Sequence, residues 1–156
     1  MHCTIYQVSS YKDTEPFTVK TIQDEYPWFL NQVADYVHPF IGPIDKIIDD
    51  YWSDRKGISY DAKSKHCIIE DRKEFFRRNY EEFTKIAKEL SAWDIDTFID
   101  KESYFKMMNL RWEYDDRYGT YILDTEGEEI TSVSEFMRYH SEGFNFYVIS
   151  AMDYHY

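Results

Sequence analysis

Cysteine, glycine, proline and long apolar runs are all scarce in this chain of 156 residues. Its two cysteines, Cys3 and Cys67, are too few for the disulfide framework of a small secreted protein, and we expect reduced thiols in a cytoplasmic protein. The five glycines and four prolines are scattered and form no linker, so one compact domain over residues 1–156 is expected. No apolar run approaches the roughly 20 residues that cross a bilayer, and no membrane partner is expected.

The motifs of common enzyme classes are absent as well. The sequence has no glycine-rich phosphate loop, no Gly-x-Ser-x-Gly elbow, no His-Glu-x-x-His zinc helix and no dinucleotide fingerprint. His38, His140 and His155 are isolated in sequence, and each is expected to be an ordinary surface or capping histidine. These absences favour a binding protein that needs no cofactor, although an enzyme whose residues converge only in the fold stays open.

Acidic side chains, by contrast, are abundant. Thirty acidic residues against eighteen basic ones give a net charge of −12. Residues 91–156 alone hold fourteen acids and five bases, a net charge of −9. A field of this sign repels nucleic acid and anionic membranes and attracts basic partners. The expected partner is therefore a basic protein surface, with no direct binding of nucleic acid.

Apolar spacing predicts helices in the first half of the chain. We expect helices over residues 27–38, 44–51 and 71–90, a polar loop over 54–64, and either a short strand or the approach to a helix at 66–69. The third helix has the clearest apolar stripe, formed by Phe76, Tyr80, Phe83, Ala87 and Leu90. Because these residues include bulky aromatics over only three heptads, packing on a sheet is favoured over a coiled coil.

Strand-forming patterns dominate the second half. Alternating or continuous apolar residues predict strands over residues 2–8, 110–114, 118–123, 128–131 and 144–152. Ser132 followed by Glu135 indicates the start of a short helix that ends near His140. This distribution is typical of an α+β fold. We expect a single domain with a mainly antiparallel sheet, built from the N-terminal strand and the C-terminal half and packed against three to five helices.

One short segment supplies an enzymatic alternative. Asp61, Asp71 and Lys73 resemble the acid…acid-x-Lys arrangement of restriction-type nucleases over about thirteen residues, without the usual preceding proline. The resemblance implies two carboxylates that hold a hard cation such as Mg²⁺ and a lysine that assists, as in a metal-dependent hydrolase or nuclease. The simpler interpretation is that Asp71 lies at a helix start, where the dipole stabilises it. The sequence also shows no basic face for a nucleic-acid substrate.

Two His-Cys pairs, His2-Cys3 and His66-Cys67, are a second possible source of metal ligands. Together they offer four zinc ligands of suitable type. Adjacent residues on a strand point to opposite faces, however, so both pairs would need irregular backbone. We therefore expect no metal site from them.

Tyrosines among the late acids suggest partner binding instead. The chain has fifteen tyrosines, and tyrosine offers a large contact area at interfaces, while neighbouring carboxylates pair with lysine and arginine of a partner. The candidate partner-binding residues are Asp94, Asp96, Asp100, Glu102, Tyr104, Tyr114, Asp115, Asp116, Tyr118, Asp124, Glu126, Glu128 and Glu129.

The leading hypothesis is an acidic protein-binding inhibitor or adaptor. Carboxylates spaced like phosphates would occupy the lysine and arginine sites of a nuclease or another DNA- or RNA-binding protein, as a nucleic-acid mimic does. In size, charge and lack of a catalytic motif the chain resembles anti-CRISPR and anti-restriction proteins of phages and mobile elements. A non-catalytic component of a larger assembly, or a toxin-neutralising protein, is a further alternative.

Overall fold

A mostly antiparallel sheet organises the protein. The computed structural model describes residues 2–115 and 119–156, with side chains described for residues 2–108 and 119–156. In these residues the strands are β1 (His2–Ser9), β2 (Tyr36–Pro39), β3 (Ile58–Asp61), β4 (His66–Ile69), β5 (Tyr121–Asp124), β6 (Glu129–Ser132) and β7 (Asn145–His155). The helices are α1 (Val19–Glu25), α2 (Pro27–Gln32), α3 (Ile44–Ser53), α4 (Arg72–Ser91), α5 (Ile95–Ile99), α6 (Lys101–Asp115) and α7 (Val133–Tyr139).

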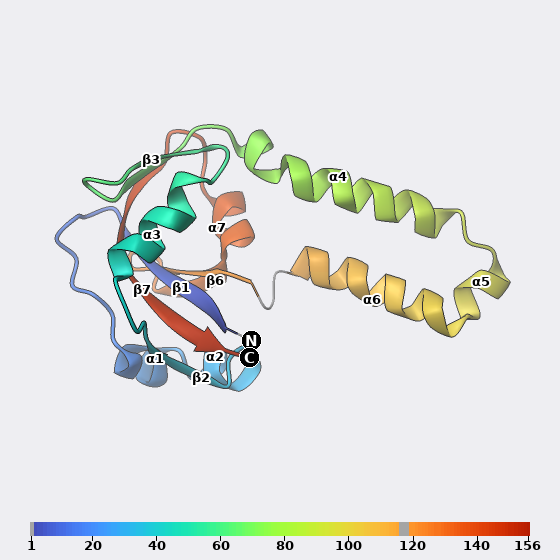
Figure 1. The fold of residues 1–156 in the computed structure, drawn as a ribbon, viewed down its shortest axis with the longest axis horizontal. Helices are drawn as coiled ribbons and strands as arrows, with labels where there is room; N and C mark the ends of the chain where they lie inside the picture. Colours follow the sequence, from blue (N-terminus) through green and yellow to red (C-terminus); the bar gives the residue numbers. More distant parts are fainter. Residues whose placement is uncertain (1, 116–118) are drawn as a thin grey trace.

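Strand β7 lies at the centre of the sheet. The strand order is β3-β4-β7-β1-β5-β6, and β2 also pairs with β7. One edge of β7 is paired along most of its length with β1, while its other edge is shared by β4 at residues 145–147 and β2 at residues 152–155. Only β1 and β5 run parallel among the described pairs. The expected α+β class with a mainly antiparallel sheet is confirmed, and the two termini lie side by side (Figure 1).

Helices cover both faces of the sheet. On one face, Ile48 and Trp52 of α3 and Phe136 of α7 pack against the even-numbered residues of β1. On the other face, Ile22 of α1 and Phe29 of α2 form a second core with the opposite sides of β1 and β7. Ser132 caps α7 as expected, since its hydroxyl accepts a hydrogen bond from the Glu135 amide at 3.1 Å. None of the helices in the described residues combines the length and apolar character needed to cross a membrane.

Two strands, β2 and β3, form where the sequence predicts the end of a helix and a loop. The helix expected over residues 27–38 ends at Gln32, and residues 36–39 form β2 instead. The physical reason is that His38 precedes a proline, which favours extended backbone, and that pairing with β7 buries Val37. The loop expected over 54–64 contains β3, which pairs with β4 in a hairpin. The first half of the chain therefore supplies β2, β3 and β4 to the sheet as well as the N-terminal strand β1.

The strand expected at residues 110–114 is wrong, because these residues belong to α6. α6 runs back along α4, and the two helices with α5 between them form an arm that projects from the body of the protein (Figure 1). The expectation that α4 packs on the sheet is also wrong over most of its length. Only its first turns reach the body, where Phe75 and Phe76 contact the core, and none of its residues is buried. α6 pairs with α4 instead and covers the stripe only in part, because Tyr80 and Phe83 stay 68% and 42% exposed.

Candidate interaction surface on the helical arm

The arm, residues 72–115, is a hairpin of two helices closed by the short helix α5. Asp71 begins α4, since its carboxylate accepts a hydrogen bond from the Glu74 amide at 2.9 Å. Lys106 of α6 forms an ion pair with Glu89 of α4 and so links the two helices. Ser103 is the only buried residue among the described side chains of the arm. A helix pair with so little core presents nearly all of its surface to solvent.

The end of the arm carries an apolar surface, which we call the tip, residues 94–105. Its large apolar side chains are each more than half exposed: Ile95 at 72%, Phe98 at 53%, Ile99 at 72%, Tyr104 at 55% and Phe105 at 54%. The rings of Tyr104 and Phe105 contact each other edge to face, with their centroids 6.0 Å apart. Exposed apolar side chains that gather in one place are typical of an interaction site.

Carboxylates lie next to these apolar side chains in the sequence. Residues 94–102 hold four acids and one base, and all four acids are exposed: Asp94, Asp96, Asp100 and Glu102. The Asp94 carboxylate caps α5 by accepting from the Thr97 amide at 2.8 Å, and these hydrogen bonds from Thr97 lower the pKa of Asp94. Asp100 in turn accepts from the Glu102 amide at 3.0 Å. The tip therefore combines exposed apolar side chains, which we call its apolar centre, with four exposed carboxylates beside them in the sequence, which we call its rim.

The remaining candidate residues lie elsewhere. Asp124, Glu126, Glu128 and Glu129 lie at the turn between β5 and β6 on the body, and Figure 1 shows the tip at the far end of the arm. Asp115, which follows the strand expected at residues 110–114, ends α6 instead. The side chains of Tyr114 and Asp115, and all of Asp116 and Tyr118, lie outside the described residues. The structure thus divides the late acids into two separate groups.

Glu126 has a structural role at the β5–β6 turn. Its carboxylate accepts hydrogen bonds from the Ser9 hydroxyl at 2.7 Å and from the Ser10 amide at 3.0 Å. These contacts fasten the turn to the end of β1, and Ser9 is buried. Glu126 therefore has a structural role, and its part in partner binding stays a prediction.

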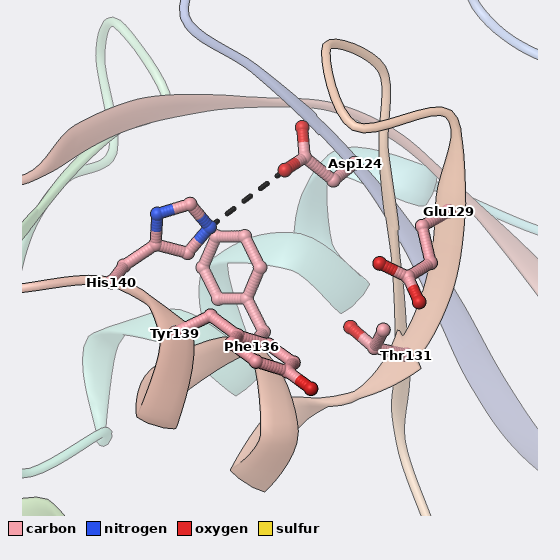
Figure 2. A pocket seen from close by; sticks show the side chains of 6 residues that line it. All are labelled: Asp124, Glu129, Thr131, Phe136, Tyr139 and His140. Atoms are coloured by element: carbon pink, nitrogen blue, oxygen red, sulfur yellow. Dashed lines mark ion pairs between the residues drawn. The ribbon is translucent and has the colours of Figure 1, made fainter.

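The hollow beside this turn is small. It is lined by Asp124, Glu129, Thr131, Phe136, Tyr139 and His140, and Figure 2 shows the Asp124 carboxylate facing the His140 ring. The Oδ2 and Nε2 atoms of this pair are 3.7 Å apart, and the His140 ring also stacks on Phe144 at 3.9 Å. The volume of about 230 Å³ lies below the roughly 300–1,000 Å³ typical of small-molecule sites. A substrate pocket is not supported here.

His140 should make the protein less stable in mild acid. Burial lowers the pKa of His140, partly opposed by the Asp124 charge. As pH falls through the ordinary histidine value of about 6.5, the unfolded chain therefore takes up a proton before the folded chain does, and stability is lost. We expect the stability difference between wild type and His140→Gln to shrink between pH 7.5 and pH 5, approximate limits set around that value. Urea unfolding at both pH values measures it, and a difference that stays constant or grows contradicts the prediction.

The residues of the nuclease-like segment do not converge. Asp61 ends β3 and accepts hydrogen bonds from Lys63 and Ser64 in its own turn. Asp71 follows β4, where its amide donates to Gly57, the residue that precedes β3. The two carboxylates thus lie at opposite ends of the β3–β4 hairpin, which at about 3.4 Å per residue separates them by roughly 10 Å or more. That is too far for one metal ion to bind both.

The two His-Cys pairs are also separate. His2 and Cys3 pair with the last residues of β7, whereas His66 and Cys67 pair with its first residues. Cys67 is fully buried, and burial raises the pKa of its thiol, which keeps it protonated and inert. The two pairs thus lie at opposite ends of β7 and cannot bind one ion together.

Searches of protein-family models, of curated proteins and of solved structures found no match to this chain. Its function must therefore be inferred from geometry. Sequence reasoning selected the tip acids and Tyr104 but missed the apolar centre formed by Ile95, Phe98, Ile99 and Phe105. Ile95, Phe98 and Ile99 lie at i, i+3 and i+4 in the sequence, a spacing that indicates one face of a helix but does not say whether another element covers it.

Proposed function

We propose that this protein is a non-catalytic binding protein, an inhibitor or adaptor, that docks the tip of its arm into an apolar pocket rimmed by lysine and arginine on a partner protein. The observation that carries this proposal is the exposure of the tip's apolar side chains together with that of the four carboxylates next to them in the sequence. Aromatic anchors that enter a pocket supply most of the binding energy of an interface, and rim charges set its orientation and association rate.

The shape of the arm supports this function. α4 and α6 hold the tip away from the body, so the tip can enter a recess that the sheet and its covering helices would not reach (Figure 1). The short helix α5 is fixed by the Asp94 cap, which limits the ordering cost when a partner binds. An enzymatic role has no comparable support, because the Asp61, Asp71 and Lys73 candidates do not come together.

The tip fits a pocket on a basic partner protein better than it fits a channel that binds nucleic acid. Mimicry of nucleic acid needs successive carboxylates that replace successive phosphates. In the tip, the four carboxylates alternate with apolar side chains, and the acids of the β5–β6 turn lie on another part of the protein. Inhibition of a DNA- or RNA-binding protein would then come from occupying a pocket beside or within its nucleic-acid site.

The test compares the tip with matched surface positions. Phe98→Ala with Ile99→Ala removes part of the apolar centre, and Asp96→Asn with Glu102→Gln removes two rim charges. Ile41→Ala with Tyr11→Ala is the apolar control, because both residues are strongly exposed on the body. Asp13→Asn with Glu25→Gln is the charge control, because it makes the same change in net charge at exposed positions away from the arm.

Each variant is immobilised and used to capture proteins from an extract of cells that naturally produce this protein. A captured protein is then purified, and its affinity for each variant is measured by titration. We expect the apolar tip variant to lose at least about 30-fold in affinity, which corresponds to about 2 kcal/mol. The charge variant should lose about 2- to 10-fold and show a weaker salt dependence between about 50 and 200 mM. If no retained protein distinguishes the tip variants from their controls, the proposal is wrong. The identity of the partner then separates an inhibitor from a toxin-neutralising protein or an assembly component.

A further inference from the structure

Three strands bring histidines and an aspartate together at the end of the sheet where the termini meet. In the register of the sheet, Asp153 of β7 lies opposite Thr4 of β1 on one side and opposite His38 of β2 on the other. His2 is two residues from Thr4, so its side chain lies on the same face as that of Asp153. His2 and His38 are 151 and 115 positions from Asp153 in the sequence. The three residues meet because β1 and β2 both pair with β7.

The distances within this cluster are short. The Oδ2 atom of Asp153 lies 2.7 Å from Nδ1 of His2 and 2.8 Å from Nε2 of His38. One nitrogen from each histidine and one carboxylate oxygen lie within 4.8 Å of one another. Asp153 is only 6% exposed, whereas the side chains of His2 and His38 are 63% and 34% exposed. A buried carboxylate thus faces two imidazoles that solvent reaches.

The contacts of His38 turn its Nε2 atom towards the Asp153 carboxylate. Its Nδ1 atom lies 2.8 Å from the Pro39 carbonyl oxygen, which can only accept, so Nδ1 carries a proton. In a neutral imidazole Nε2 then has a lone pair, and this lone pair faces the Asp153 oxygen. Two acceptor atoms 2.8 Å apart must share a proton or face a bound cation. A histidine that binds a metal commonly donates its other N–H to a backbone carbonyl, as His38 does here.

Aromatic rings hold the histidines in place. Tyr36 stacks on His38 with ring centroids 5.7 Å apart, and on His155 at 5.0 Å with an angle of 4° between the rings. His155 in turn contacts the edge of the His2 ring at 5.2 Å, and its Nδ1 lies 3.6 Å from the Asp35 carboxylate. Tyr36 and His155 therefore restrict the orientation of both candidate ligands, which is the role of an outer shell around a metal.

We infer that His2, His38 and Asp153 form a binding site for a divalent transition-metal ion of the zinc class. Imidazole nitrogens suit Zn²⁺, Co²⁺, Ni²⁺ and Cu²⁺, whereas a single carboxylate with two imidazoles is a poor site for Mg²⁺ or Ca²⁺. Zinc–ligand bonds of about 2.0–2.2 Å place tetrahedral ligand atoms about 3.3 Å apart, so each His–Asp distance needs to widen by roughly half an ångström. With three protein ligands, one position is left for water or for an outside ligand.

The test uses untagged protein purified without metal resin and dialysed against a chelator, because an added histidine tag would mask the site. Calorimetric titration with Zn²⁺ should show one tight site per chain, and Co²⁺ should give the visible absorption of a four-coordinate complex. We expect His38→Ala and Asp153→Asn to weaken Zn²⁺ binding by at least about 10-fold. Mg²⁺ should give no comparable signal.

His66→Ala is the matched control, because His66 lies on β4 outside the cluster, and we expect it to bind Zn²⁺ like wild type. Asp153 is buried, so His2→Ala at a mostly exposed position gives a second ligand variant whose folding can be checked by circular dichroism. Absence of a stoichiometric Zn²⁺ site in wild type overturns the inference. Equal binding by the control and by all three ligand variants also overturns it, since exposed carboxylates would then hold the ion. The tip variants serve as a further check, since loss of partner binding should leave the Zn²⁺ titration unchanged.

Discussion

Gly57→Ala is expected to lower the free energy of unfolding by about 2–5 kcal/mol. Gly57 has φ +76°, which costs an alanine about 1–2 kcal/mol. An added Cβ would overlap the carbonyl oxygen of Asp71 and lie 2.9 Å from the amide nitrogen of Phe75. Displacing this backbone costs about 1–3 kcal/mol more. Asp71 and Phe75 form the first turn of α4, so the substitution presses on the base of the arm.

Gly143→Ala is the matched control for this prediction. Gly143 has φ +87°, but nothing lies within 4 Å of its added Cβ, so we expect only the conformational cost of about 1–2 kcal/mol. Urea unfolding of the two variants and of wild type measures both effects. Equal losses at the two positions would show that the contact between Gly57 and α4 is loose in solution, and the arm would then not be fixed to the body at this point.

The periodicity of α4 shows what a sequence pattern does and does not determine. A stripe such as Phe76, Tyr80, Phe83 and Leu90 indicates a helix, because the spacing matches the helical repeat. It does not say whether a sheet or another helix covers the stripe. That choice depends on residues 101–115, whose alternating apolar residues fit a strand over a short window and yet form a helix. The helix expected over residues 71–90 is therefore confirmed as α4, and the expectation that it packs on the sheet is wrong over most of its length.

The candidate sites show a similar division. Composition drew attention to acids such as Asp96 and Glu102, since charge is visible in the sequence, and their role in partner binding stays a prediction. The cluster of His2, His38 and Asp153 could not be found in this way, because it depends on which strands flank β7 and in what register. A shift of one residue would turn His38 to the opposite face of the sheet. The sequence also indicates a helix where β2 forms, which removes His38 from the sheet altogether.

Trp52→Ala is the second substitution with a large expected effect, about 3–5 kcal/mol of stability. Trp52 is 1% exposed and lies where α3 meets the sheet. Its ring contacts Tyr6, Tyr51 and Phe146 with centroid distances of 5.6, 5.2 and 5.5 Å. Truncation leaves a cavity among these rings that they cannot fill without losing their own contacts. Trp28→Ala is the control, since Trp28 is 39% exposed and should cost less than about 1 kcal/mol.

Trp52→Phe should be far milder, and the reason is chemical. The buried Nε1 of Trp52 has no hydrogen-bond partner among the described residues, and such a donor costs about 1–3 kcal/mol. Phenylalanine removes this unpaired donor while keeping most of the ring volume, so the two effects offset each other and the net loss should not exceed about 1.5 kcal/mol. Urea unfolding of wild type and both Trp52 variants gives the comparison. A Trp52→Phe variant as unstable as Trp52→Ala would mean that Nε1 is hydrogen-bonded in solution, with an internal water as its partner.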